Sequence, residues 1–201
     1  MSDGIDIKFV QERYQSMSDD DLVRVATQDA YGLTPEAIEV VKAEIQNRGL
    51  DDNFVKGVEA QNKTYSLEEV DIYCGIVSNL SCPSCGKRTE RLNGTMISEV
   101  MSFILFTNYN KKIIVGCPYC LDKANDDALL KTALLGWWGI PWGIIRTPQA
   151  IRLNLKSKRT NHQQESNDYL RSFTLSVIGE LETYKDNKEK LLEIVTRRNG
   201  L

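Results

Sequence analysis

Histidine is almost missing from this chain: His162 is the only one among 201 residues. A serine–histidine catalytic site would depend on that side chain, which lies in a polar stretch and is expected at the surface. The sequence also lacks a phosphate-binding glycine loop, a Gly-x-Ser-x-Gly motif and a His-Glu-x-x-His motif. We therefore expect that the protein is not an enzyme and takes no small-molecule substrate.

Long apolar runs are missing as well. The nearest candidate, residues 129–145, contains Lys131, three glycines and a proline, whereas a spanning helix needs about 20 mostly apolar residues. An interfacial or buried segment fits this stretch better. Residues 1–20 show no basic start followed by an apolar stretch, so no secretory signal is expected. The resulting prediction is a cytoplasmic protein, with peripheral contact to a membrane left open.

A strong positive charge is the third absence. The net charge is -3, which argues against a dedicated nucleic-acid binder. The charge is unevenly spread, because residues 1–60 hold 13 acidic and 6 basic side chains, net -7, and the remainder therefore carries +4. An acidic N-terminal part and a mildly basic remainder follow from this distribution.

Cysteine is present in a telling pattern. Four of the five cysteines form two Cys-Pro-x-Cys pairs, Cys82 with Cys85 and Cys117 with Cys120. Two intervening residues let both sulfurs of a tight turn face one point about 2.3 Å away, and two such turns complete a tetrahedron. We expect Zn²⁺ bound by all four thiolates, which leaves no open position and makes the site structural. Cys74 is expected to be a buried core thiol.

Two other uses of these cysteines stay open. A Cys-Pro-x-Cys pair can act as a redox dithiol, although two matched pairs without a thioredoxin-like βαβ pattern favour a metal. Four cysteines can also hold an iron–sulfur cluster.

The two pairs, with Gly86 after the first pair and a hairpin-like stretch between them, resemble the zinc-ribbon fold group over residues 80–122. Residues 133–150, with their Gly-Trp-Trp-Gly-Ile-Pro-Trp-Gly core, are similar to a segment that follows zinc ribbons in uncharacterised bacterial proteins. The resemblance implies a binding or scaffolding module and carries no further chemistry.

The predicted fold class is α+β, mainly helical with a small zinc-ribbon β hairpin. Ser18, Thr34 and Ser66 are expected to cap helices, and Gly49 to end one. Strands are predicted over 95–106 and 112–115 with a turn at 108–111, a helix over 97–106 being the alternative. Another helix is expected from Thr147 to about residue 155.

Composition suggests four consecutive segments. Residues 1–62 form an acidic helical unit and residues 63–156 the zinc-ribbon domain with its tryptophan-rich segment. Residues 157–168 are a polar linker, and residues 169–201 are C-terminal helices.

The tryptophan-rich segment is the candidate interaction site. It contains all three tryptophans, Trp137, Trp138 and Trp142, and basic residues that include Arg146 and Arg152 follow it without an intervening acid. The rings could cover a core, contact a membrane or membrane protein, or fill the groove of a soluble partner. We favour the core cover.

Function then falls into three classes. The first is a zinc-stabilised interaction or scaffold protein, with a protein partner or contact at the membrane face. The second is a nucleic-acid-associated ribbon, since basic residues lie in and beside the hairpin: Lys87, Arg88, Arg91, Lys111 and Lys112. The third and weakest is a thiol redox protein.

Overall fold

The computed structural model describes residues 7–104 and 106–201, and these fall into two compact units. The first unit takes in the chain up to residue 69 together with 176–191, and the second takes in 70–175 and 192–201. Each unit thus combines segments that are distant in the sequence, whereas the four segments suggested by composition are consecutive. The division falls inside α5 (Leu67–Ser78) and α10 (Lys188–Asn199).

The first unit is helical. It contains α1 (Ile7–Gln15), α2 (Asp19–Arg24), the π-helical turn η1 (Val25–Asp29), α3 (Pro35–Asn47), α4 (Asn53–Asn62) and α9 (Ile178–Thr183). The predicted caps are confirmed: the Ser18 and Thr34 hydroxyls accept from the N–H groups of residues 21 and 37, and Gly49 has a φ of 65°. Apolar residues such as Leu22, Val41 and Ile45 form its core.

The Arg48 side chain bonds to the C-terminal end of α1 and to the residues that follow it. Its guanidinium donates to the backbone carbonyls of Tyr14, Gln15 and Met17, at the end of α1 and just beyond it. The same side chain bonds to the carboxylate of Asp19. Carbonyls at a helix C-terminus have no partner within the helix, so a cation there satisfies them.

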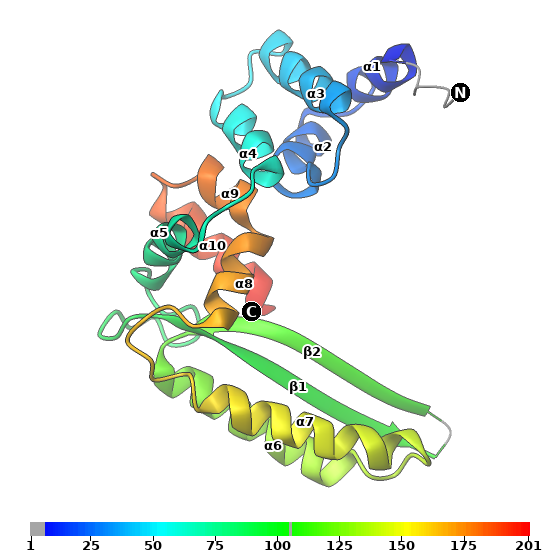
Figure 1. Cartoon of the computed structure of the whole chain (residues 1–201), viewed down its shortest axis with the longest axis vertical. Helices are drawn as coiled ribbons and strands as arrows, with labels where there is room; N and C mark the ends of the chain where they lie inside the picture. Colours follow the sequence, from blue (N-terminus) through cyan, green and yellow to red (C-terminus); the bar gives the residue numbers. More distant parts are fainter. Residues whose placement is uncertain (1–6, 105) are drawn as a thin grey trace. The chain divides into compact units, whose positions relative to one another are not determined.

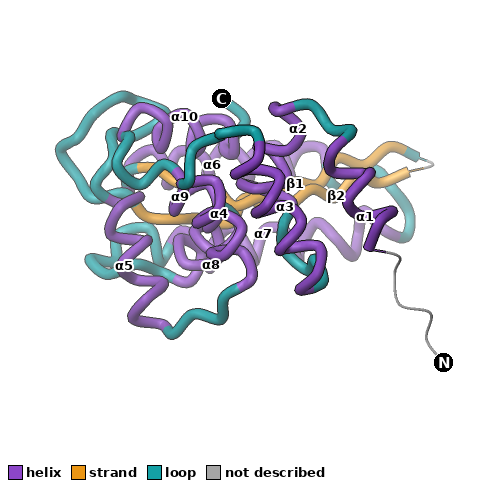
Figure 2. The backbone as a smooth tube through the Cα atoms, turned by 90° about the horizontal axis from the view of Figure 1, so that it is seen from above, coloured by secondary structure: helices purple, strands orange, loops and turns teal. Residues whose placement is uncertain are grey.

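The second unit is built on a hairpin of β1 (Asn93–Phe103) and β2 (Phe106–Gly116), which form a two-stranded antiparallel sheet. Helices α6 (Pro118–Leu135) and α7 (Trp142–Lys158) pack against β1 along its length (Figure 1). The unit also holds α8 (Asp168–Ser176) and parts of α5 and α10. Among the described residues this hairpin is the whole of the β-structure (Figure 2), so the prediction of a mainly helical α+β protein is confirmed.

The hairpin is longer than the sequence predicted, and its turn is elsewhere. Val100 pairs with Tyr109 and Ser98 with Lys111, so residues 108–111 lie within β2 and do not form the turn. The chain reverses between Phe103 and Phe106 instead. Polar residues on an exposed edge strand resemble a turn in composition, which explains the error. The alternative helix over residues 97–106 is also wrong.

The helix expected at Thr147 begins earlier, at Trp142, and Pro148 lies inside it. Thr147 is buried within the helix and does not cap it. Proline favours the first turn of a helix, but Pro148 occupies the seventh position of α7. Helix α6 was not predicted at all; it begins at Cys117 as N-cap, with Pro118 in its first turn.

The polar residues after α7 are a packed loop. Helix α7 runs to Lys158, and beyond it Asn161 and Asn167 are buried. Asn167 donates to the carbonyls of Gly94 and Thr160, while Asn93 donates to the carbonyls of residues 163 and 165. The stretch 157–168, expected to be a polar linker, thus contains the end of α7 and buried side chains that bond to neighbouring backbone groups.

Buried side chains occupy the outer edge of β1. Every second residue of this strand points its backbone groups away from β2, and side chains from neighbouring segments bond to several of these groups. Asn154 accepts from the N–H of Ser98 and donates to its carbonyl, at 3.1 and 2.6 Å. Met96 O accepts from Asn125, Val100 N donates to Thr132, and Gly94 O accepts from Asn167.

Near the C-terminal end of β2, a buried side chain also bonds to the outer edge of this strand. Val115 N donates to Asn199 Oδ1 at 2.9 Å, and Val115 O accepts from Asn199 Nδ2 at 2.7 Å. A primary amide presents one acceptor and one donor group, the same pair that a neighbouring strand would offer. Asparagine side chains thus stand in for missing strands.

Replacing Asn154 with alanine tests this role. The change removes the partner of the buried Ser98 N–H and leaves the Ser98 carbonyl only a long bond of 3.5 Å from Thr132 Oγ1. A buried group that loses its partner costs about 1–3 kcal/mol. We expect Asn154→Ala to lower the free energy of unfolding by roughly 2–4 kcal/mol in denaturant titrations. Asn110→Ala, at an exposed position of β2, is the matched control and should change stability by less than about 0.5 kcal/mol. Equal stability of the two variants would contradict the assignment.

Candidate metal centre and apolar tip

The first cysteine pair lies in a tight turn after α5. Cys82 N donates to Lys87 O at 2.9 Å, and Gly86 N donates to Cys82 O at 2.7 Å. Gly86 has a φ of 71°, a conformation that glycine adopts without steric cost. The expected role of Gly86 in closing the turn after the second cysteine is confirmed.

The second pair is held differently. Cys117 follows the last residue of β2 and is the N-cap of α6, Pro118 takes the first helical position, and Cys120 lies in the first turn. The sequence predicted a tight turn at each cysteine pair, so this pair departs from that pattern. The tight turn at Cys82 and Cys85 and the hairpin between the pairs match the expectation. The helical setting of Cys117 and Cys120 does not.

These turns bring the four sulfurs together. The Sγ atoms of Cys82, Cys85, Cys117 and Cys120 all lie within 4.8 Å of one another, and those of Cys85 and Cys117 are 3.9 Å apart. Four sulfurs at the corners of a tetrahedron, each about 2.3 Å from a central Zn²⁺, would be about 3.8 Å apart. The donor set and its spacing therefore fit a single bound metal ion.

Backbone N–H groups near Cys82 favour the negatively charged thiolate form of this residue. Burial opposes ionisation of the Cys82 thiol, but backbone N–H groups, led by that of Cys117 at 3.4 Å, outweigh it and lower its pKa to about 7. Burial and the crowding of neighbouring thiols raise the pKa values of Cys117 and Cys120. Several thiolates this close repel one another, and a divalent cation among them removes that penalty.

The remaining cysteine and the histidine lie as expected. Cys74 is fully buried, and burial raises the pKa of its thiol, as in an inert core residue. His162 is exposed, with Nε2 2.9 Å from a carboxylate oxygen of Asp122. Neither residue belongs to the four-cysteine cluster.

The tryptophans are exposed, so the favoured core-cover interpretation is wrong. Trp137, Trp138 and Trp142 keep 44, 68 and 58% of their surface accessible. They occupy the turn between α6 and α7 and the first position of α7, beside the end of the hairpin (Figure 1). The glycines in this turn permit close contact: a Cβ on Gly139 or Gly143 would lie within 3.1 Å of Ser102 Cβ on β1.

The end of the hairpin adds further apolar side chains to the tryptophans. Together they form a surface that we call the apolar tip, made of Phe103, Ile104, Phe106, Leu134, Leu135, Trp137, Trp138, Ile140, Trp142, Ile144 and Ile145, all exposed. A hollow of about 450 Å³ between Phe103, Ile104, Phe106, Leu135, Trp138 and Ser102 has almost wholly apolar walls. Sequence reasoning missed the hairpin part because it placed the turn at 108–111; the apolar run at 103–106 was its signal.

Several polar atoms at the apolar tip are bonded internally. The indole N–H groups of Trp137 and Trp138 donate to the carbonyls of Ala133 and Leu134, both at 3.0 Å. The hydroxyl of Ser102 lies 3.0 Å from that of Thr107. These groups can therefore be withdrawn from water without losing their hydrogen bonds.

Basic residues lie behind the apolar tip. The guanidinium of Arg146 lies 5.2 Å from the ring centroid of Tyr109, and Lys111 Nζ lies 4.9 Å from the same centroid. Lys131 Nζ is 3.1 Å from Glu99. Arg152, a further predicted interaction residue, is exposed on α7.

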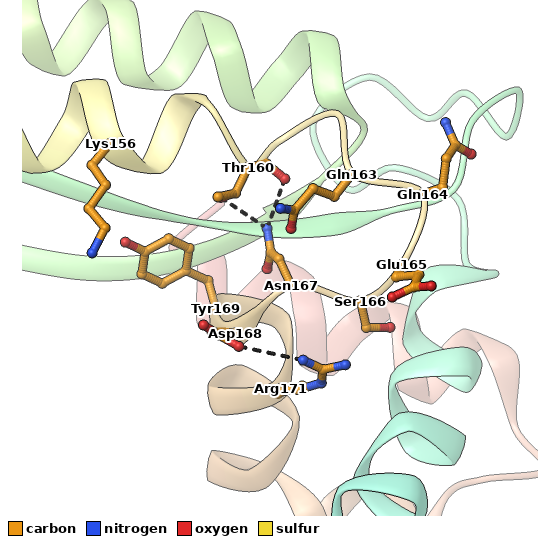
Figure 3. Close-up of a pocket in the computed structure, with 10 residues that line it drawn as sticks. All are labelled: Lys156, Thr160, Gln163, Gln164, Glu165, Ser166, Asn167, Asp168, Tyr169 and Arg171. Atoms are coloured by element: carbon orange, nitrogen blue, oxygen red, sulfur yellow. Dashed lines mark hydrogen bonds and ion pairs between the residues drawn. The ribbon is translucent and has the colours of Figure 1, made fainter.

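A separate polar hollow of about 770 Å³ lies beside the loop after α7 (Figure 3). Its strongest donor is already engaged: Arg171 forms bonds of 2.8 and 3.0 Å to Asp71 and a contact of 3.5 Å to Asp168. Asn167 bonds to Thr160, as the dashed lines show. These groups hold the loop and α8 in place, which indicates a structural role for this region.

Comparisons with protein-family models, curated proteins and solved structures find no match. Within the described residues, none of the helices combines the length and apolar character needed to cross a membrane. The functional argument therefore depends on the four cysteines and the apolar tip.

Because all three tryptophans of the chain belong to the apolar tip, tryptophan fluorescence reports on this surface alone. We expect long-wavelength emission and ready quenching by acrylamide, since the rings are open to water. Trp138→Phe should lower the quenchable intensity without changing the unfolding midpoint. Blue-shifted emission that resists quenching would restore the core-cover interpretation.

Proposed function

We propose that this chain is a non-enzymatic interaction protein in which a structural Zn²⁺ ion, held by Cys82, Cys85, Cys117 and Cys120, stabilises the base of the hairpin. Four thiolates complete a tetrahedral zinc site and leave no position for water or substrate. The site thus supplies folding free energy. Thiols kept reduced for metal binding fit a cytoplasmic location.

The observation that carries the interaction role is the exposed apolar tip. Contiguous exposed apolar patches on soluble domains mark contact sites. Between Phe106 and Gly116 the strand β2 advances by ten residues, or about 34 Å. The metal centre lies next to Gly116 and the apolar tip at the other end of this strand. The metal therefore fixes one end of the hairpin, and the other end exposes the apolar tip for contact with a partner.

The nucleic-acid alternative has less support. Of the five basic residues that suggested it, Arg88 donates to Asn79 O, Arg91 to Ser78 Oγ and Lys112 to Asn199 O. These cations are engaged by the protein itself, so they are less available to phosphates. The redox alternative is weakened by the four-sulfur cluster, because Cys82, whose pKa is lowered to about 7, is buried, whereas a redox thiol has to be accessible.

Metal analysis tests the zinc part of the proposal. We expect one zinc per chain in the purified protein, and we expect Cys117→Ser to lower both the zinc content and the unfolding midpoint, because the thiolate ligand is lost. Cys74→Ala is the matched control, since Cys74 is a buried thiol outside the cluster. Removal of zinc by a chelator should lower the unfolding midpoint of the wild-type chain.

Two results would count against this site. One is a protein without zinc whose four clustered thiols all react freely in the native state. The other is a zinc content that Cys117→Ser leaves unchanged.

A further inference from the structure

We infer that the occupant of the apolar tip is the interface of a lipid bilayer bearing anionic headgroups, into which the tip inserts without spanning. This inference rests on the proposed interaction role of the tip and names its partner. It is carried by the chemistry of the tip, by the spacing between the tip and the cations behind it, and by the way its segments are fixed.

The chemistry of the apolar tip suits hydrocarbon. Residues 101–107 and 132–145, which supply it, contain no charged side chain. The indole N–H groups of Trp137 and Trp138 are bonded within their own helix end. A polar group enters a membrane at low cost only when its hydrogen bonds are made internally.

The same property disfavours a protein partner. Protein interfaces usually carry about one hydrogen bond per 100–200 Å² and a polar rim. The apolar tip offers few side-chain donors or acceptors among its described residues, because the indole N–H groups of Trp137 and Trp138 and the Ser102–Thr107 hydroxyl pair are already bonded. A fluid acyl layer needs no such directional groups, and it can fill the apolar hollow beside Trp138.

The position of the charges matches the depth of an interface. Tyr109, over which Arg146 and Lys111 lie, pairs with Val100, three residues before Phe103. At about 3.4 Å per residue these cations stand about 10 Å behind the end of the hairpin. Interfacial elements bury their apolar face about 5–10 Å into the boundary between headgroups and acyl chains. The cations would then lie at the level of the phosphates.

Charge complementarity selects anionic lipid. The stretches 99–112 and 131–152 carry five basic residues and one acid, Glu99, for a net charge of +4, although the whole chain is negative. Each cation near an anionic surface strengthens binding about fivefold. Lys131 is offset by its contact with Glu99, so Arg146 and Lys111 are the informative pair.

The segments of the tip are held in one arrangement before any lipid is met. Gly139 and Gly143 press the α6–α7 turn against Ser102 at distances that leave no room for a side chain. Gly143 N also donates to Gly139 O at 2.6 Å. A surface that is ordered in advance loses little conformational entropy on binding.

Vesicle flotation with the full, zinc-loaded chain tests the inference. We expect binding to phosphatidylcholine vesicles that contain phosphatidylglycerol, weaker binding without it, and a blue shift of tryptophan emission on binding. The double variant Ile104→Asp/Ile140→Asp should lower the partition coefficient at least about tenfold. Both side chains are about four-fifths exposed, at 83 and 79%, so the fold should persist.

Two further variants sharpen the result. Ile72→Asp, on α5 and 68% exposed, is the matched control and should bind like the wild type. Lys111→Gln/Arg146→Gln should weaken binding to the anionic vesicles about fivefold per cation while leaving binding to neutral vesicles unchanged.

Failure to bind anionic vesicles, or binding that the double isoleucine variant leaves intact, would overturn the bilayer assignment. If vesicles are not bound but the wild type self-associates and the double variant does not, the bilayer assignment fails while the interaction role of the tip stands. If the double variant alters neither vesicle binding nor self-association, the bilayer assignment and the interaction role both fail.

Discussion

A two-stranded sheet has two edges and no centre, and the second unit is organised around that constraint. An isolated hairpin is marginally stable in water, and its outward backbone groups need partners wherever helices cover them. Here Asn125 and Asn154 from α6 and α7, with Asn167 from the following loop, bond to alternate residues of β1. The helices can therefore lie on the hairpin while these outward N–H and carbonyl groups of β1 keep hydrogen-bond partners.

This arrangement links the metal centre to the apolar tip. The hairpin begins and ends beside the cysteine pairs, and its far end supports the tryptophan turn. The four-cysteine cluster lies at the base of the hairpin, the asparagines bond along its edges, and Gly139 and Gly143 bring the α6–α7 turn onto Ser102 at the far end.

The sequence predicted the features whose signals are local. Caps at Ser18 and Thr34 and the turn at Gly86 follow from single side chains and a backbone angle. The cysteine spacing predicted a cluster that the fold assembles. Local composition misled at Asn108–Lys111 and at Pro148, where a polar strand resembled a turn and an interior proline resembled a helix start. The exposed apolar tip depends on which segments meet in space, so the pattern of residues 133–150 could not decide between burial and exposure.

Two buried asparagines near the base of the hairpin also bear on the covalent lifetime of the chain. Asn93 and Asn199 are each followed by glycine, the sequence in which the next amide nitrogen most readily attacks the side-chain carbonyl and causes deamidation. Both side chains are buried and held: Asn93 donates to two carbonyls, and Asn199 brackets Val115. Attack on either amide would require those hydrogen bonds to break. Deamidation at both positions should therefore require this end of the hairpin to open first. A metal ion bound by the cysteines would stabilise the closed hairpin and so slow deamidation at two residues that are not metal ligands.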